Sequence, residues 1–255
     1  EINWQEIRLH RKLSPEGTRN VFAASWLGTP VAVKKFRILK NAPEMLWASK
    51  DVTKVIRRAV LREVTILSSL SHPNIVQFLG CSLNVPSGSG REKIRSSMRR
   101  RRRGTSSSHA REESIDIDDD ASSVWIVTEL LKGRTLYESV RSRKRVFTLE
   151  SVLRLAVDIA KGMVFIHSRN VTHGDLKSSN ILLSGSGASC KIIDFGESAV
   201  VDALSDESGG GGTLGWNAPE RLTQSSNHTK KSDVWSWAIV VRKIIVENLC
   251  SKRSL

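Results

Sequence analysis

The sequence predicts an α+β fold in two lobes, a small β-rich lobe followed by a helical one. Short runs of strand-type residues fill the first part of the chain, the apolar period then becomes helical, and a second long amphipathic helix follows further along. We expect the N-terminal lobe to span residues 1–131 and the C-terminal lobe residues 132–255, with a hinge near Leu130–Gly133.

Short apolar or β-branched runs predict the strands of the N-terminal lobe. Glycine and proline interrupt these runs, as is usual at turns. The predicted strands are Ile7–Leu13, Val21–Trp26, Val31–Phe36, Phe78–Leu83 and Val124–Glu129. A low-complexity insertion, about residues 86–123, separates the last two strands. A hairpin tolerates such an insertion because the entropy cost of closing a loop grows only with the logarithm of its length.

A charged residue on the apolar face of the first predicted helix indicates an ion pair. Glu63 shares a face with the apolar residues, and an unpaired buried charge is strongly destabilising. The candidate partner is Lys34, which ends the apolar strand segment Val31–Lys34. The apolar stripe of the helix consists of Val52, Ile56, Val60, Leu67 and Leu70.

The C-terminal lobe is predicted to contain a long helix that follows the capping residue Thr148. Two short strands around Ile181 and Ile192 come next, and a further helix starts at about Asp233. The inner face of the helix after Thr148 is predicted to consist of Val152, Leu153, Ala156, Ile159, Ala160, Met163 and Ile166.

Length and composition exclude several classes of protein. With 255 residues and 39% hydrophobic content, the chain is long enough for one or two packed cores. Its three cysteines are too far apart for a disulfide framework or paired metal ligands, so we expect an intracellular, cytoplasmic protein. No secretory leader opens the chain, and Arg242 and Lys243 interrupt the apolar stretch Trp235–Val246. Neither secretion nor a membrane span is therefore predicted.

The formal net charge of +14 raises nucleic acid as an alternative partner. The densest basic cluster, Arg99–Arg103, lies in the Ser- and Gly-rich insertion and precedes the acidic run Glu112–Asp120. Such charge blocks with few large apolar residues are typical of a solvated, disordered loop. We therefore do not expect nucleic acid as the main partner. Nucleic-acid association or nuclear localisation through Arg99–Arg103 stays open as a second alternative.

Three short motifs in the second half of the chain carry the chemistry. They read HGDLKSSN at His173–Asn180, DFG at Asp194–Gly196 and APE at Ala218–Glu220. Their order and spacing resemble a protein kinase, whose signatures are H-R-D-L-x-x-x-N, D-F-G and A-P-E. Lys177, the Gly212–Trp216 run and the Glu1–Trp4 opening are similar to the tyrosine-kinase-like serine/threonine group, to which the Raf and mixed-lineage kinases belong.

The resemblance implies a protein serine/threonine kinase that transfers the γ-phosphoryl group of ATP to protein substrates. It assigns Lys34 to the α- and β-phosphates, with Glu63 holding the lysine in place. Asp175 becomes the aspartate that takes the proton of the substrate hydroxyl, and Lys177 the lysine near the transferred phosphate. Each residue alone could be an ordinary surface or turn residue, but their joint spacing argues against that interpretation.

The resemblance also implies Mg²⁺ and an adenine site. Asn180 and Asp194 match the magnesium ligands of the family, and an oxygen-only donor set suits Mg²⁺ better than a soft metal. Thr128 occupies the gatekeeper position. The adenine site is carried over by position alone, and ordinary core residues would look the same. Its members are Val21, Ala32 and Leu182 around the ring, with Glu129 and Leu131 supplying backbone groups.

The sequence departs from the family pattern in three places, of which the first and the third favour a first alternative, a catalytically impaired pseudokinase or scaffold. The glycine-rich loop is degraded, with Ser14, Glu16 and Arg19 at the three glycine positions. Gly174 replaces the catalytic-loop arginine, as in the so-called non-RD kinases. The likeness fades after Val241, and we expect a C-terminal lobe that lacks its last helices.

An active kinase is nevertheless the leading hypothesis. Asp175, Asn180 and Asp194 are all present, and catalysis is the simplest reason for assembling them in one chain. We expect these three residues to converge on one site, and Lys34 and Glu63 to form a salt bridge.

Overall fold

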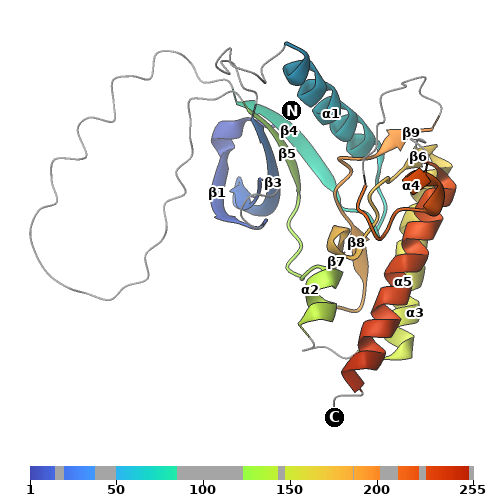
Figure 1. The fold of residues 1–255 in the computed structure, drawn as a ribbon. Coiled ribbons are helices and arrows are strands. Elements are labelled where there is room, and N and C mark those ends of the chain that lie inside the picture. Colours follow the sequence, from blue (N-terminus) through green and yellow to red (C-terminus); the bar gives the residue numbers. More distant parts are fainter. Residues whose placement is uncertain are drawn as a thin grey trace, which may run out of the picture.

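The computed structural model describes the chain as a sheet and a group of helices (Figure 1). The described residues are 1–14, 20–37, 50–84, 123–142, 147–185, 187–201, 212–223 and 228–252. Some expectations fall outside these ranges. They concern the glycine-loop positions Glu16 and Arg19, nearly all of the insertion, and Arg99–Arg103.

The predicted strands form an antiparallel five-stranded sheet in the order β1-β2-β3-β5-β4 (Figure 1). Their bounds are β1 Ile7–Lys12, β2 Val21–Trp26, β3 Thr29–Arg37, β4 Phe78–Asn84 and β5 Ser123–Glu129. β3 begins earlier than predicted because Leu27 and Gly28 form the two-residue turn of a hairpin. Both have positive φ angles, 47° and 84°, which match the right-handed twist of the flanking strands.

The two faces of this sheet have different roles. Val31 and Val33 of β3 are fully buried on one face. Successive residues of a strand alternate between faces, so Ala32 and Lys34 lie on the other. Cross-strand pairing adds Val21 opposite Lys34 and Thr128 opposite Ala32 to that second face. The sheet thus keeps a packed face apart from the face that carries predicted site residues.

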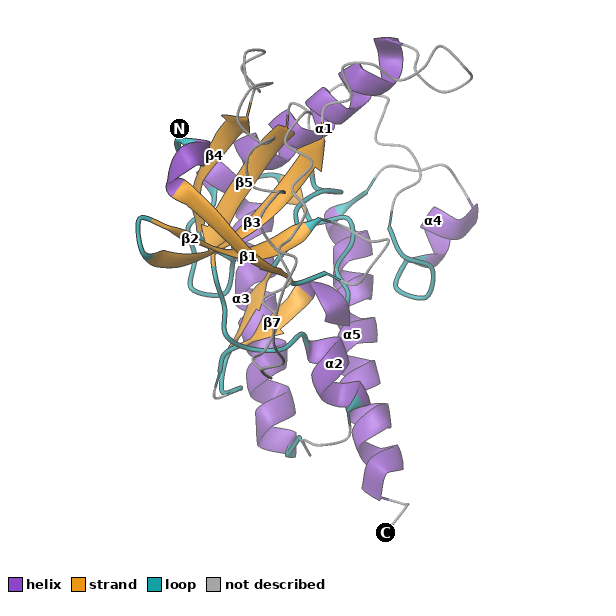
Figure 2. Ribbon diagram, turned by 90° about the vertical axis from the view of Figure 1, so that its left-hand side faces the viewer, coloured by secondary structure: helices purple, strands orange, loops and turns teal. Residues whose placement is uncertain are grey.

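Helices make up most of the remaining structure (Figure 2). α1, Lys50–Ser69, lies beside β4, and α3 and α5 run side by side below the sheet (Figure 1). The other helical elements are η1 Trp4–Glu6, α2 Leu136–Arg141, α3 Leu149–Ser168, η2 Ser178–Asn180, α4 Pro219–Thr223 and α5 Lys230–Lys252. Two small antiparallel pairs join β6 Val171–Thr172 to β9 Ala199–Val200, and β7 Ile181–Leu183 to β8 Cys190–Ile192. An α+β fold, as predicted, is confirmed, whereas the lobe boundary at residue 131 stays a prediction.

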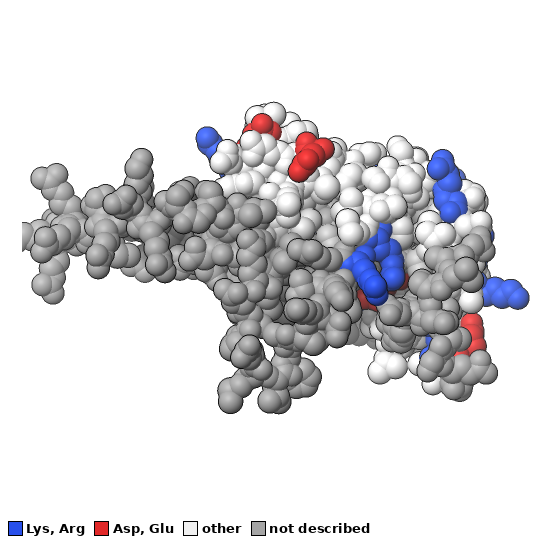
Figure 3. Space-filling model, turned by 90° about the horizontal axis from the view of Figure 1, so that it is seen from above, with Lys and Arg blue, Asp and Glu red and all other residues white. Residues whose placement is uncertain are grey.

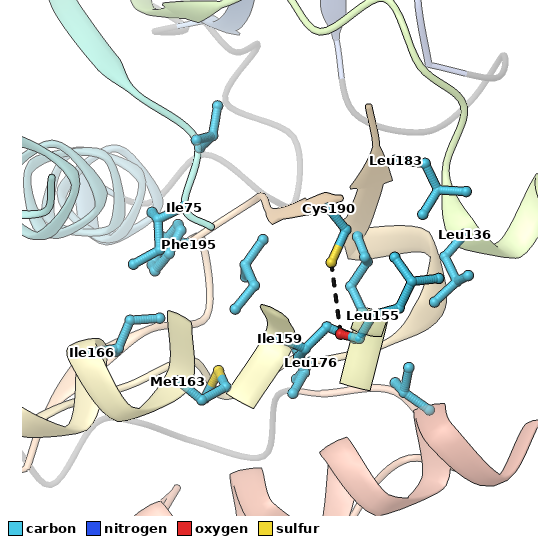
Figure 4. Close-up of a cluster of buried hydrophobic side chains, with 14 of the residues drawn as sticks. Ile75, Leu136, Leu155, Ile159, Met163, Ile166, Leu176, Leu183, Cys190 and Phe195 are labelled. Atoms are coloured by element: carbon cyan, nitrogen blue, oxygen red, sulfur yellow. Dashed lines mark hydrogen bonds between the residues drawn. The ribbon is translucent and has the colours of Figure 1, made fainter. Parts of the chain in front are cut away.

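A large cluster of buried side chains joins α1, α3, α5 and the short strands (Figure 4). Cys190 lies inside it, with its thiol 3.9 Å from the carbonyl oxygen of Leu155. Burial raises the pKa of this thiol to about 12, so Cys190 behaves as an apolar core residue. Val240 and Ile244 of α5 belong to the same cluster, so α5 contributes to the core on both sides of Val241.

The predicted inner face of α3 needs one correction. Leu153 is 57% exposed, whereas Leu155 is buried and takes its place in the core. With 3.6 residues per turn, Leu155 lies on the same face of the helix as the other buried residues, whereas Leu153 does not. The predicted cap is confirmed, because the Thr148 side chain accepts a hydrogen bond from the backbone N–H of Ser151.

In the described part of the chain, no helix combines the length and apolar character needed to cross a bilayer.

Candidate active site

The expected ion pair between β3 and α1 is present and includes a third residue. The Lys34 ammonium donates to both carboxylate oxygens of Glu63, at 2.7 and 2.8 Å. It also donates to Oδ1 of Asp194 at 2.9 Å. Glu63 is only 3% exposed, so the ammonium compensates a carboxylate that would otherwise be buried unpaired. Residues distant in the sequence thereby meet at one cation.

Asp194 is held in a strained backbone conformation next to a fully buried aromatic ring. Its φ angle is 67°, a left-handed value that is uncommon for residues other than glycine. Such strain costs about 1–3 kcal/mol and persists only where the surroundings fix it. Phe195 does so, because its ring is fully buried in the core and lies 5.1 Å from the His173 ring. In this conformation the Asp194 carboxylate contacts the Lys34 ammonium.

The catalytic-loop carboxylate Asp175 is bound by a cation and a hydroxyl group. Its Oδ2 lies 2.6 Å from the Lys177 ammonium, and its Oδ1 accepts a hydrogen bond of 2.7 Å from Thr213 Oγ1. Lys177 also donates to Thr213 Oγ1, at 2.6 Å. Burial acts to raise the pKa of Asp175, but the hydrogen bonds from Lys177 and Thr213 outweigh it and lower the pKa. Asp175 is therefore an ionised acceptor at neutral pH.

Asn180 links this carboxylate to the segment after β8 that carries Asp194. Its side-chain nitrogen donates to the backbone carbonyl of Asp175 at 2.8 Å and to Asp175 Oδ2 at 3.1 Å. Its backbone carbonyl accepts a hydrogen bond from Ile193, the residue before Asp194. With the nitrogen engaged, the amide oxygen of Asn180 is the atom that could take a cation. Asp175 and Asn180 are thus in direct contact, and Asp194 follows the residue that is bonded to Asn180. The convergence of all three side chains on one site stays a prediction.

The donor set of this region fits Mg²⁺. Asp194 and Asn180 offer a carboxylate and an amide oxygen, which are hard ligands. Within the described ranges, no group of three or more His, Cys, Asp or Glu side chains could hold a metal ion. Few protein ligands are typical of Mg²⁺, which keeps several waters and binds substrate phosphates.

Asp233 is an important residue that the sequence interpretation missed. It was noted only as the start of a helix, but its Oδ2 accepts a hydrogen bond from the His173 N–H at 2.9 Å, and its Oδ1 accepts one from the Gly174 N–H at 3.0 Å. The His167 ring lies 2.9 Å from the same carboxylate. A buried carboxylate at the start of α5 therefore fixes the backbone just before Asp175. An acidic residue opening an apolar helix was the only signal in the sequence.

The glycine that replaces the family arginine has a local structural cause. Gly174 has a φ angle of 79°, which strongly favours glycine. A Cβ atom at this position would lie 2.5 Å from the backbone oxygen of Glu197, closer than real contacts allow. The His228 ring occupies the next nearest space, at 3.1 and 3.2 Å. No arginine fits here without a shift of the backbone.

The residues carried over to the adenine site are only partly brought together. Val21 and Ala32 are half-buried on the sheet face that also carries Lys34, as their pairing requires. Glu129 ends β5, and its carboxylate lies 2.6 Å from the Lys191 ammonium. Leu131 is half-buried just beyond β5. Leu182 lies on the separate β7–β8 hairpin, where it pairs with Lys191, so its place against the ring stays a prediction.

On the one face of the molecule that Figure 3 shows, the described lysines and arginines stand singly or in small groups, and acidic residues lie on the same face. Arg99–Arg103, on which the nucleic-acid alternative depended, lies outside the described residues.

We compared the sequence with known protein families. Residues 23–254 match the protein kinase domain, which is most of the chain. The chain therefore belongs to the protein kinase domain family. The match extends past Val241, where the likeness was expected to fade. Membership in this family implies use of ATP, and typically of Mg²⁺.

Individual relatives carry serine/threonine kinase names. The chain is 30% identical over 248 residues to the serine/threonine-protein kinase TNNI3K of Mus musculus and to that of Homo sapiens. These alignments cover 96% of this chain but 24% of each relative. The serine/threonine-protein kinase STY17 of Arabidopsis thaliana is 25% identical over 249 residues, which is 98% of this chain and 35% of the relative. The relatives agree with the resemblance to the tyrosine-kinase-like serine/threonine group.

Proposed function

We propose that this chain is a protein serine/threonine kinase that transfers the γ-phosphoryl group of ATP to hydroxyl groups of protein substrates. The observation that carries the proposal is the Lys34 ammonium held at once by Glu63 and Asp194. Phosphoryl transfer needs cations and donors placed against phosphate oxygens rather than covalent chemistry by the protein. A preformed lysine of this kind, fixed beside a carboxylate that can bind a metal, provides such a placement.

The proposed roles follow from the contacts of each residue. Lys34 would bind the α- and β-phosphates, and Glu63 would keep its ammonium in position. The Asp175 carboxylate would accept the proton of the substrate hydroxyl as that oxygen forms a bond to the γ-phosphorus and ADP leaves. Lys177, already bound to Asp175, would compensate charge on the transferred group. Asp194 and Asn180 would hold Mg²⁺, which supplies positive charge to the phosphates when bound.

The nucleotide base would bind on the sheet face that carries Lys34. Val21 and Ala32 would contact the ring, as would Leu182, and the backbone of Glu129 and Leu131 would bind its edge. The nucleotide would then lie between the two lobes that we propose, residues 1–131 and residues 132–255. The alternative of a pseudokinase or scaffold depends on the glycine-loop positions and on the expected loss of the last helices, and a test of turnover separates the two functions.

The test measures Mg²⁺-dependent transfer of labelled γ-phosphate from ATP to myelin basic protein, followed by analysis of the labelled amino acids. We expect phosphoserine and phosphothreonine from the wild-type chain and loss of transfer in Asp194→Asn. Glu150→Gln is the matched control, because this carboxylate is exposed on α3, far from the motif residues in the sequence. It should retain activity.

The outcome that contradicts the proposal is equally specific. If folded wild-type protein transfers no phosphate, or if Asp194→Asn transfers it equally well, the chain is not a kinase of this mechanism. Circular dichroism of each variant establishes that it is folded. Binding of ATP without transfer would then support the pseudokinase alternative.

A further inference from the structure

We propose that Arg221 is a positioning residue for the catalytic loop, supplying from α4 a positive charge that Gly174 cannot supply from within the loop. The inference depends on the proposed kinase function, because the loop that Arg221 positions carries Asp175. Neither the motif spacing nor the resemblance drew attention to Arg221, which follows Glu220 directly in the sequence.

Arg221 reaches the loop through a histidine. Its guanidinium lies 2.6 Å from the His228 ring, joining Nη1 to Nε2. A guanidinium has only donors, so Nε2 of His228 is the acceptor in this bond. His228 is buried, and two of its ring atoms lie 3.1 and 3.2 Å from the place where a Cβ of residue 174 would be. The ring therefore packs against the Gly174 backbone and the guanidinium fixes the ring.

Several carboxylates attract the charge of Arg221, and two of them, Asp233 and Asp175, act on or belong to the loop. Burial lowers the pKa of the guanidinium, and attraction by Asp233, Glu197, Asp175 and Glu220 acts in the opposite direction. Asp233 holds the backbone N–H groups of the loop, and Asp175 is its reactive carboxylate. Partly buried carboxylates that lie close together repel one another, because the local dielectric constant is far below that of water. Arg221 offsets this repulsion.

Among the described residues, Lys177 is a second cation near Asp175, and it is already engaged. Lys177 is bound to Asp175 and to Thr213, on the side of the loop that faces the substrate in the proposed mechanism. Residue 174 itself can carry no side chain, since a Cβ there would meet the Glu197 carbonyl. From α3, the His167 ring already contacts the Asp233 carboxylate at 2.9 Å. Arg221, on the short helix α4, adds a permanent positive charge that Asp233 and Glu197 attract.

The test compares three variants of the chain in steady-state kinetics. Arg221→Gln removes the charge but keeps length and a hydrogen-bond donor, and we expect kcat to fall about 10- to 100-fold because the loop is misplaced. The KM for ATP should stay within about twofold, since Arg221 is proposed to act on the loop that carries Asp175 and not on Lys34. Arg221→Lys keeps the charge and should restore most of kcat. Arg154→Gln, at an exposed ion pair on α3, should behave as wild type.

A purely structural role predicts a different pattern. It would lower the thermal stability of Arg221→Gln and Arg221→Lys alike, with no selective rescue of kcat by lysine. That pattern, or an unchanged kcat in Arg221→Gln, overturns the inference. If Arg221→Gln does not fold, His228→Leu is measured in its place. Loss of the Nε2 acceptor should reduce kcat by a similar factor. An unchanged kcat in His228→Leu also overturns the inference. An inactive wild-type chain would instead contradict the proposed kinase function.

Discussion

At the scale of single residues, two backbone conformations fix the segments that carry Asp175 and Asp194. Gly174 and Asp194 both have positive φ angles, and they lie directly before Asp175 and at the start of the DFG motif. Asp194 has a side chain and is therefore strained in this conformation, which persists because the neighbouring Phe195 is fixed in the core. Gly174 avoids the strain, and the Glu197 carbonyl fills the space that a side chain would need. Each residue type is thus determined by its backbone as much as by its chemistry.

Replacing Gly174 by alanine should therefore destabilise the protein. The left-handed backbone alone costs about 1–2 kcal/mol, and the contact of the new Cβ with the Glu197 oxygen adds to it. Gly185→Ala is the control, since a Cβ there would meet nothing within 4 Å. Urea unfolding followed by circular dichroism measures both. Equal free energies of unfolding for the two variants would show that the Gly174 backbone is not constrained as described.

At the scale of the elements, one capping residue stabilises the beginning of α3. Thr148 is in an extended conformation, and its hydroxyl oxygen accepts the N–H of Ser151, one of the donors that a helix leaves unsatisfied. We expect Thr148→Ala to lower the free energy of unfolding by about 0.5–2 kcal/mol. Thr148→Ser keeps the oxygen and should cost little. Chemical unfolding distinguishes them, and a similar loss in both variants would contradict the capping role.

At the scale of the whole molecule, the Lys34 ammonium joins three elements that are far apart in sequence. It connects β3 to α1 through Glu63 and to the segment after β8 through Asp194. A nucleotide that binds this ammonium should stabilise the folded chain by mass action, by about 2.7 kcal/mol at a concentration of 100 Kd. Lys34→Met should lose that stabilisation in a thermal shift with ATP and Mg²⁺.

The neighbouring lysine offers a matched control for this prediction. Lys35 lies on the opposite face of β3, where its ammonium is 5.6 Å from the centre of the Trp125 ring. Lys35→Met should keep the ATP-dependent shift even if its basal melting temperature changes. The assignment of Lys34 would be wrong if both variants responded to ATP like the wild type.

Local patterns made much of this architecture predictable. The strands followed from short β-type runs, and the ion pair from Glu63 on an apolar stripe. Thr213, Arg221 and Asp233 could not be found in this way, because each acts on Asp175 or on the backbone before it from a distant part of the chain. No local period encodes such contacts. Leu153 was wrongly predicted to face the core. It is hydrophobic, but its position on α3 lies away from the buried face of the helix.

The carboxylate of Asp233 has a consequence for the motions of the protein. The amide hydrogens of His173 and Gly174 are donated to a side chain on α5 rather than to a neighbouring strand. Solvent can reach these amides only when the first turn of α5 separates from the loop. Their deuterium exchange should therefore follow that of the α5 backbone, so that the loop and the helix open as one cooperative unit.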